Sequence, residues 1–224
     1  MKRVCVYIDG FNVFHAIKKA FGKKYFWLNY KQLAREYLQH WEILEQVYYF
    51  SAFFYSDAEG VKRHKEYVRA LQKKGIKIIL GKYQERDAKF DKKRNPIISV
   101  SYWKDTQTEK SEIQKLPVPD ILAYNKFEEK RTDVNMAIQI VIDGLLDKYD
   151  KAIIITGDSD IAPAIEAVKK RLKGKEFVSV VPIWWKGRTI SHVCWSKIEM
   201  KESHLSNAQF PEIMGTIEKP EWWE

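Results

Sequence analysis

Apolar runs alternate along this chain with segments whose apolar residues recur at helical spacing. The runs are rich in β-branched and aromatic residues and predict strands at residues 3–9, 46–55, 76–80, 152–156 and 177–182. The segments beside them predict helices at residues 12–20, 30–40, 58–74, 132–145 and 160–172. Towards the C-terminus, residues 190–194 are compatible with a strand and residues 204–208 with a turn of helix. This alternation indicates an α/β fold, a parallel sheet with helices on both faces.

The helix predicted to begin at Thr132 has a broad apolar side. Its stripe consists of residues at helical spacing, namely Val134, Ala137, Ile138, Val141, Ile142 and Leu145. Met136 and Ile140 widen this stripe. We therefore expect the helix to be well buried, with Thr132 as its N-cap.

The alternation breaks between residues 82 and 128. Residues 82–95 are dense in Lys and Arg, and a run at 97–103 is compatible with another strand. A stretch of this length is too long for an ordinary connection, so we interpret it as an insertion. The sequence thus predicts a single domain over residues 1–210, with an insertion at about 82–128 and a C-terminal tail at 211–224.

The chain is basic. Its 224 residues include 39 Lys and Arg against 30 Asp and Glu, which gives a net charge of +9. Such a surface favours polyanions, either nucleic acid or an anionic membrane. The alternative is that Lys-rich helix faces only keep the protein soluble.

Cysteine content and hydropathy indicate a reducing compartment. Cys5 and Cys194 belong to no CxxC or Cys/His spacing, so neither a zinc ribbon nor a disulfide framework is indicated. The chain begins directly with a predicted strand, and no run approaches the ~20 apolar residues of a membrane span. We therefore expect a soluble, cytoplasmic protein with no membrane partner.

Carboxylates stand where predicted strands give way to helices. Asp9 ends the first strand, Asp158 and Asp160 follow the fourth, and Asp133 opens a helix. The carboxyl ends of parallel strands meet at one crevice, so these acids are expected to lie close together. Gathered carboxylates repel each other unless some are protonated or a cation lies among them. The pattern therefore predicts a polyacidic metal site.

Each acid also has a purely structural interpretation. Asp9-Gly10 is a common turn, and Asn12 is a common helix cap. Capping explains one of Asp158 and Asp160, and Asp133 is favourable against the helix dipole. Only the coincidence of all of them favours a site.

Several other chemistries are not indicated. No Walker loop occurs, and no GxGxxG follows the first strand. A phosphotransferase with an aspartyl nucleophile would carry a second Asp two residues after Asp9, where Phe11 stands. The five histidines form no convincing acid–base pair, and His192 lacks a ligand spacing.

Three motifs occur in order, Ile8-Asp9-Gly10-Phe11-Asn12, Lys130 to Asn135, and Thr156-Gly157-Asp158-Ser159-Asp160. With them the chain resembles NYN-domain proteins, of the PIN-like nuclease superfamily, over about residues 3–81 and 128–210. This resemblance implies a PIN-like three-layer fold with a mostly parallel five-strand sheet and a metal-dependent ribonuclease site. Two departures are Arg131, where relatives carry Gly, and Gln209, where they often carry an acid.

The resemblance also implies roles for residues. The catalytic set would be Asp9, Asn12, Asp133, Asp158 and Asp160. Of these, the four aspartates would bind Mg²⁺ or Mn²⁺. Lys130, Arg131 and Ser159 would contact the substrate, and the basic stretch 82–94 would follow its backbone. The aromatic residues Tyr102, Trp103 and Trp185 are candidates for stacking on unpaired bases.

The resulting hypothesis is a metal-dependent endoribonuclease that acts on single-stranded or structured RNA and leaves a 5′-phosphate. One alternative is a non-catalytic NYN module that binds RNA or a protein. Another is a metal-dependent nucleotide phosphatase. Because related folds often pair, a homodimer also remains open.

Overall fold

A computed structural model describes residues 1–91, 121–183 and 190–221, without the side chains of 87–91 and 121–125. The chain divides into two compact units. The first consists of residues 1–83 and 129–224, and the second of residues 84–128. The predicted strand at 97–103 and the aromatic residues Tyr102, Trp103 and Trp185 lie outside the described residues.

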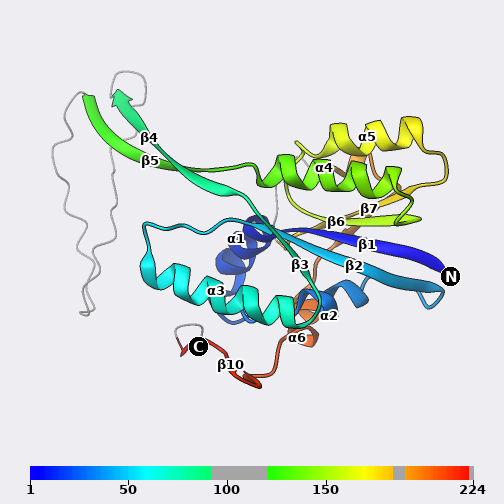
Figure 1. Cartoon of the computed structure of the whole chain (residues 1–224), viewed down its shortest axis with the longest axis horizontal. Coiled ribbons are helices and arrows are strands. Elements are labelled where there is room, and N and C mark those ends of the chain that lie inside the picture. Colours follow the sequence, from blue (N-terminus) through cyan, green and yellow to red (C-terminus); the bar gives the residue numbers. More distant parts are fainter. Residues whose placement is uncertain (92–120, 184–189, 222–224) are drawn as a thin grey trace. The chain divides into compact units, whose positions relative to one another are not determined.

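A parallel sheet forms the middle layer of the first unit (Figure 1). In the described part of the chain it has six strands in the order β3-β2-β1-β6-β7-β8. These strands are β1 (Lys2–Asp9), β2 (Glu42–Ser51), β3 (Lys77–Leu80), β6 (Lys151–Ile155), β7 (Glu176–Val181) and β8 (Ser196–Glu199). The predicted α/β class and parallel sheet are confirmed, with one strand more than the five expected.

The sixth strand, β8, follows residues 190–194, which were wrongly predicted to form a strand. Residues 190–192 form a short 3-10 helix, and the strand β8 begins at Ser196. Its sequence Ser-Lys-Ile-Glu has one apolar residue, which is too little for a strand signal. Pairing rather than local sequence accounts for this strand, because β8 pairs in parallel with the buried strand β7.

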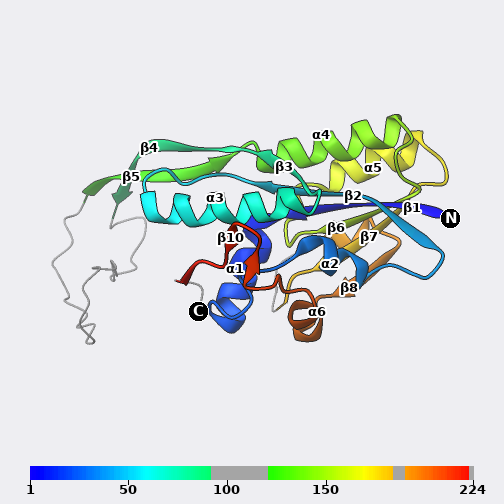
Figure 2. The same ribbon diagram turned by 60° about the horizontal axis from the view of Figure 1, so that its bottom comes forward.

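Helices cover both faces of the sheet, as Figures 1 and 2 show. On one face lie α1 (Gly10–Phe21), α2 (Tyr30–Arg35), α3 (Ala58–Lys73) and α6 (Glu202–Asn207). On the other face lie α4 (Thr132–Leu145) and α5 (Ala162–Arg171). Among the described helices, none combines the length and apolar content needed to cross a bilayer.

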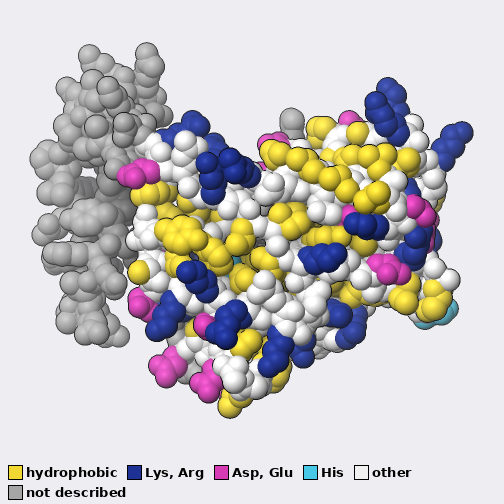
Figure 3. Space-filling model, viewed as in Figure 1, with side chains coloured by type: hydrophobic (Ala, Val, Ile, Leu, Met, Phe, Trp, Pro, Cys, Tyr) yellow, Lys and Arg dark blue, Asp and Glu magenta, His cyan; other side chains and the backbone are white. Residues whose placement is uncertain are grey.

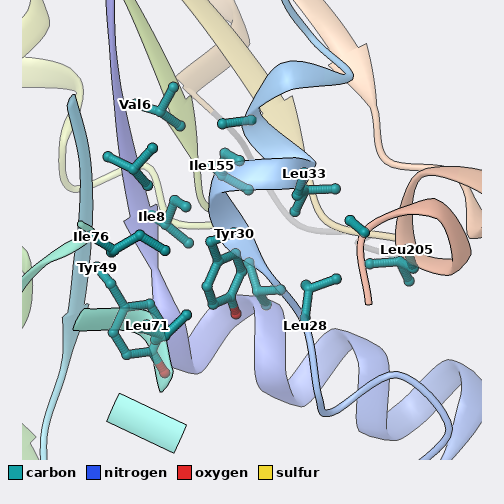
Figure 4. Packing of buried hydrophobic residues seen from close by; sticks show 14 of the residues in the cluster. Val6, Ile8, Leu28, Tyr30, Leu33, Tyr49, Leu71, Ile76, Ile155 and Leu205 are labelled. Atoms are coloured by element: carbon teal, nitrogen blue, oxygen red, sulfur yellow. The ribbon is translucent and has the colours of Figure 1, made fainter. Parts of the chain in front are cut away.

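Alternation along β1 divides the interior into two cores. Val4, Val6 and Ile8 face the layer of α1 and α2, while Cys5 and Tyr7 face α4 and α5. Figure 4 shows part of the first core, with Val6 and Ile8 beside side chains of other elements. Because β1 is buried on both sides, its end is held firmly, and so is Asp9.

The C-terminal residues extend the first core. Strands β9 (Ile213–Met214) and β10 (Ile217–Glu218) form a short antiparallel hairpin. Met214 and Ile217 are buried in this core. In the middle of the chain, β4 (Lys82–Asp91) and β5 (Ile121–Lys130) form a separate two-stranded sheet.

The expected burial of α4 is wrong for its main stripe. Its buried apolar residues are Met136 and Ile140, whereas Val134, Ile138 and Leu145 are exposed. Figure 3 shows hydrophobic side chains gathered over this helix. Apolar residues occur on two sides of α4, so periodicity alone does not reveal which side faces the sheet. Gly144 marks the side of α4 that faces inward, because a side chain at this position would collide with Tyr149 and would crowd α5.

A pair of substitutions checks this orientation. Ile138 is 50% exposed and Ile140 is 0% exposed. We expect Ile138→Gln to change the free energy of unfolding by less than about 0.5 kcal/mol. The milder change Ile140→Val is expected to cost about 0.5–1.5 kcal/mol, because it leaves a cavity. Urea denaturation measures both, and a larger cost at Ile138 would contradict the orientation.

Candidate active site

Three of the predicted acids, Asp9, Asp158 and Asp160, follow the two strands at which the strand order of the sheet reverses. β1 and β6 are parallel neighbours, with Ile8 opposite Ile155. From β1 the chain continues into α1 on one face, and from β6 it continues into α5 on the other. Diverging connections of this kind leave a crevice at the carboxyl ends of the two strands. Asp9 and the segment 156–160 lie at these ends.

A hydrogen-bond network fixes Asp9. Its carboxylate accepts bonds from the Asn12 backbone N–H (3.0 Å) and the Thr156 hydroxyl (2.9 Å), and also from the Asn12 side-chain amide. The Asn12 amide oxygen in turn accepts a bond from the Gly157 backbone N–H (3.1 Å). Asp9, Asn12 and the end of β6 are thus joined by hydrogen bonds into one connected group.

Burial makes Asp9 an unusual acid. It is 3% exposed. Loss of solvation raises its pKa to about 6, against the lowering effect of its hydrogen bonds and with help from the charges of Glu129 and Asp158. The Asp9 carboxylate is therefore held in place by neutral hydrogen-bond donors, and no cationic side chain of the described residues is among the main contributors to its pKa.

Asp133 approaches the same point from the first turn of α4. Burial raises its pKa to about 7, and the charges of Asp9, Asp158, Glu129 and Asp160 add to this effect. Its charge therefore interacts with four other carboxylates, although they come from three distant parts of the sequence.

The backbone at Gly81 packs closely against the start of α4. A Cβ on Gly81 would lie 2.5 Å from the Thr132 hydroxyl oxygen and 2.6 Å from the Lys130 carbonyl oxygen. Arg131 has a φ of 78°, in the left-handed region that glycine adopts most easily. The Gly expected here in related sequences thus has a conformational reason, and Arg131 adopts that conformation with an exposed side chain.

The remaining predicted residues lie at the margin. Asp158 is half-buried and accepts a bond from the Asp160 backbone N–H (2.9 Å), while Asp160 itself is exposed. Ser159 and Lys130 are half-buried. The structure therefore brings Asp9, Asp133 and Asp158 together and leaves Asp160 at the edge of the group.

Glu129 also lies beside these acids, although the sequence did not single it out. One of its carboxylate oxygens, Oε1, is buried and has no hydrogen-bond partner among the described residues. Its charge raises the pKa of both Asp9 and Asp133. Glu129 stands in the run Glu128-Glu129-Lys130-Arg131, which has the form of a solvated charge cluster. It lies at the end of β5, and nothing in this run indicates that its side chain is buried beside the acids.

The chemistry of these residues fits a divalent cation. Within the described residues, no three Asp, Glu, His or Cys side chains are arranged as a ready-made ligand set. The donors are nonetheless carboxylate oxygens, which suit Mg²⁺ and Mn²⁺, and Mg²⁺ commonly keeps several of its waters. The unpartnered Glu129 oxygen and the raised pKa values of Asp9 and Asp133 are what a missing positive charge would leave behind.

Comparisons with known proteins agree with this fold. The family model of the NYN domain matches residues 3–187. The protein 6-hydroxy-3-succinoylpyridine 3-monooxygenase HspA of Pseudomonas putida (strain DSM 28022 / S16) is 27% identical to this chain. The alignment is 252 positions long, gaps included, and spans 99% of this chain and 75% of that protein. The crystal structure of a protein of unknown function, VPA0982 from Vibrio parahaemolyticus RIMD 2210633, has a TM-score of 0.55. It covers 93% of this chain and 96% of its own at 11% identity, so it is similar in fold alone.

Proposed function

Because this chain belongs to the NYN domain family of the PIN-like nuclease superfamily, we propose that it is a metal-dependent endoribonuclease. The observation that carries this proposal is the gathering of carboxylates at the switch point of the sheet. Burial, and with it the charges of Asp9, Asp158 and Glu129, raises the pKa of Asp133 to about 7. Such repulsion disfavours folding, so the cluster needs a function to account for it.

Each residue has a defined part in the proposed reaction. Asp9, Asp133, Asp158 and Glu129 would hold Mg²⁺ or Mn²⁺. When bound, the ion lowers the pKa of coordinated water and stabilises the charge that develops at phosphorus. Asn12 keeps the Asp9 carboxylate in one orientation through its two bonds to it. Asp160, exposed beside the cluster, would orient the attacking water or bind a second ion.

Basic residues near the acids would bind the substrate. Lys130 and Arg131 directly precede α4, and Arg131 is exposed. Together with Ser159 they would contact phosphates, and the net charge of +9 would favour the approach of RNA. That the basic stretch 82–94 follows the RNA backbone stays a prediction from the sequence, because the side chains of residues 87–94 lie outside those described.

The proposal is tested by incubating the protein with end-labelled single-stranded RNA. We expect internal cleavage with Mn²⁺ or Mg²⁺, none with EDTA, and 5′-phosphate ends on the downstream products. Tight RNA binding without cleavage under every metal condition would favour the non-catalytic module instead. Release of phosphate from mononucleotides, with RNA left intact, would favour the phosphatase.

A second candidate comes from the similarity to the Pseudomonas putida protein, which extends over 99% of this chain. Its name describes oxidation of a substituted pyridine, a reaction that requires O₂ and an electron donor. Consumption of O₂ with 6-hydroxy-3-succinoylpyridine and a reduced nicotinamide cofactor would support it. The ribonuclease remains our preferred function, because it uses the carboxylate cluster.

A further inference from the structure

A cavity of about 330 Å³ lies beside the end of β1. Its lining comes from residues 10–83, all within the first unit, and includes Gly10 and Phe11, which directly follow Asp9. The volume lies at the small end of the range for pockets that hold organic ligands. The cavity is therefore suited to a single ring system rather than to a peptide.

Its inner wall consists of three buried tyrosines, Tyr30, Tyr49 and Tyr67. The ring centroids of Tyr30 and Tyr49 are 5.2 Å apart, and Figure 4 shows both rings in the first core. A Cβ on Gly10 would lie 2.5 Å from the Tyr49 ring, so only glycine lets that ring pack against the start of α1. The charge of Asp9 helps to raise the pKa of both Tyr30 and Tyr49. The cavity and the acidic cluster are thus immediate neighbours.

Less buried aromatic rings form another part of the wall. Tyr83 contacts Phe11 and Phe54 edge to face, with centroid distances of 5.8 Å and 5.0 Å. Phe54 is 37% exposed, so part of its surface faces solvent as well as the cavity. Aromatic rings arranged in this way offer a flat ligand both stacking and edge contacts.

A few polar groups interrupt this aromatic lining. The Ser51 hydroxyl and the His64 Nε2 are 3.4 Å apart, and Ser51 is buried. Burial lowers the pKa of His64 to about 4, so its ring is neutral at pH 7 and can both donate and accept. Two cationic side chains, Lys18 and Arg63, also line the cavity, against one carboxylate, Asp57, so the net charge of the lining is positive. The polar groups therefore suit a ring with donors, acceptors and an attached anion.

We propose that this cavity binds one planar heteroaromatic ring carrying an anionic group. In the ribonuclease proposed above, the ring is an unpaired RNA base, whose phosphate lies beside Asp9. This assignment to RNA rests on the proposed function, whereas ring binding itself does not. The same chemistry would also suit a free heteroaromatic acid, and the experiment distinguishes the two sources.

Binding is measured by calorimetry in EDTA, with AMP, UMP, nicotinate and ribose 5-phosphate as probes. We expect at least one ring compound to bind and ribose 5-phosphate, which lacks the ring, not to bind. Phe54→Ala removes one ring contact, and Val61→Phe fills space from a residue of α3 that lines the cavity. Each is expected to weaken binding about 5- to 100-fold, the range for one stacking contact. The exposed Trp41, outside the cavity, provides the matched control Trp41→Ala, which should leave binding unchanged.

RNA cleavage separates this inference from the proposed function. If cleavage occurs, Phe54→Ala should raise KM for RNA with a smaller effect on kcat, and Asp158→Asn should abolish cleavage but keep ring binding. Ring binding without any cleavage would support the cavity site with a free acid as its ligand and reject the RNA assignment. Metal-dependent cleavage with no ring compound bound, or with equal binding by folded Phe54→Ala and Val61→Phe, would overturn the inference and leave the ribonuclease standing.

Discussion

Replacement of Asp158 by Asn is expected to lower RNA cleavage at least about 100-fold without unfolding the protein. Asn keeps an oxygen at the position that accepts the bond from the Asp160 backbone N–H, so the local turn is preserved. It removes one negative charge from the cluster and with it part of the attraction for a divalent cation. Initial rates at saturating Mn²⁺, together with thermal unfolding of the variant, measure the effect.

The matched control is Asp147→Asn. Asp147 lies before β6, at the edge of the sheet opposite the cluster, and pairs on the surface with Arg3 and Lys175. Its loss should leave cleavage unchanged. Asp9→Asn should resemble Asp158→Asn, and Glu129→Gln should raise the Mn²⁺ concentration needed for half-maximal activity on the order of 10-fold or more. Full activity of both Asp variants would remove the basis of the proposed function.

The second large effect is on stability. In EDTA at pH 8, Asp133→Asn is expected to raise the free energy of unfolding by about 2–3 kcal/mol. The side chain is half-buried among carboxylates, and its pKa is raised to about 7 from the ordinary 3.8. Asn has nearly the same shape but no charge, so it escapes both the loss of solvation and the repulsion.

The size of this effect depends on pH. Because the folded protein holds the Asp133 proton more tightly than the unfolded chain, wild-type stability falls as pH rises from about 4 to about 7, and falls no further above that. The advantage of the Asn variant should therefore vanish below about pH 4. Mn²⁺ should stabilise the wild type more than the variant. Urea unfolding at pH 4 and pH 8 checks this, and an equal advantage at both values would show that charge is not the cause.

How much could be predicted from sequence depended on how local the signal was. The end of β1 is marked by a run of buried β-branched residues directly before Asp9, so both the strand and its acid could be identified. Glu129 could not, because its significance comes from burial beside Asp9 and Asp133, which sequence proximity does not show. The orientation of α4 failed for a similar reason, since two of its sides are apolar.

The cavity has no sequence signal at all. Tyr30 comes from α2, Tyr49 from β2 and Tyr67 from α3, and each alone resembles an ordinary core aromatic residue. Only the fold places them around one space. The aromatic residues that the sequence offered for stacking, Tyr102, Trp103 and Trp185, are outside the described residues.

The points where the chain leaves and re-enters the first unit have a consequence for evolution. Tyr83 precedes the second unit and Glu129 follows it, and the charge of Glu129 helps to raise the pKa of Tyr83, so the two are near each other. Closing a long loop between neighbouring ends costs little additional entropy as its length changes. The second unit can thus be lengthened, shortened or exchanged among relatives as a module, while the acids and the cavity keep their positions.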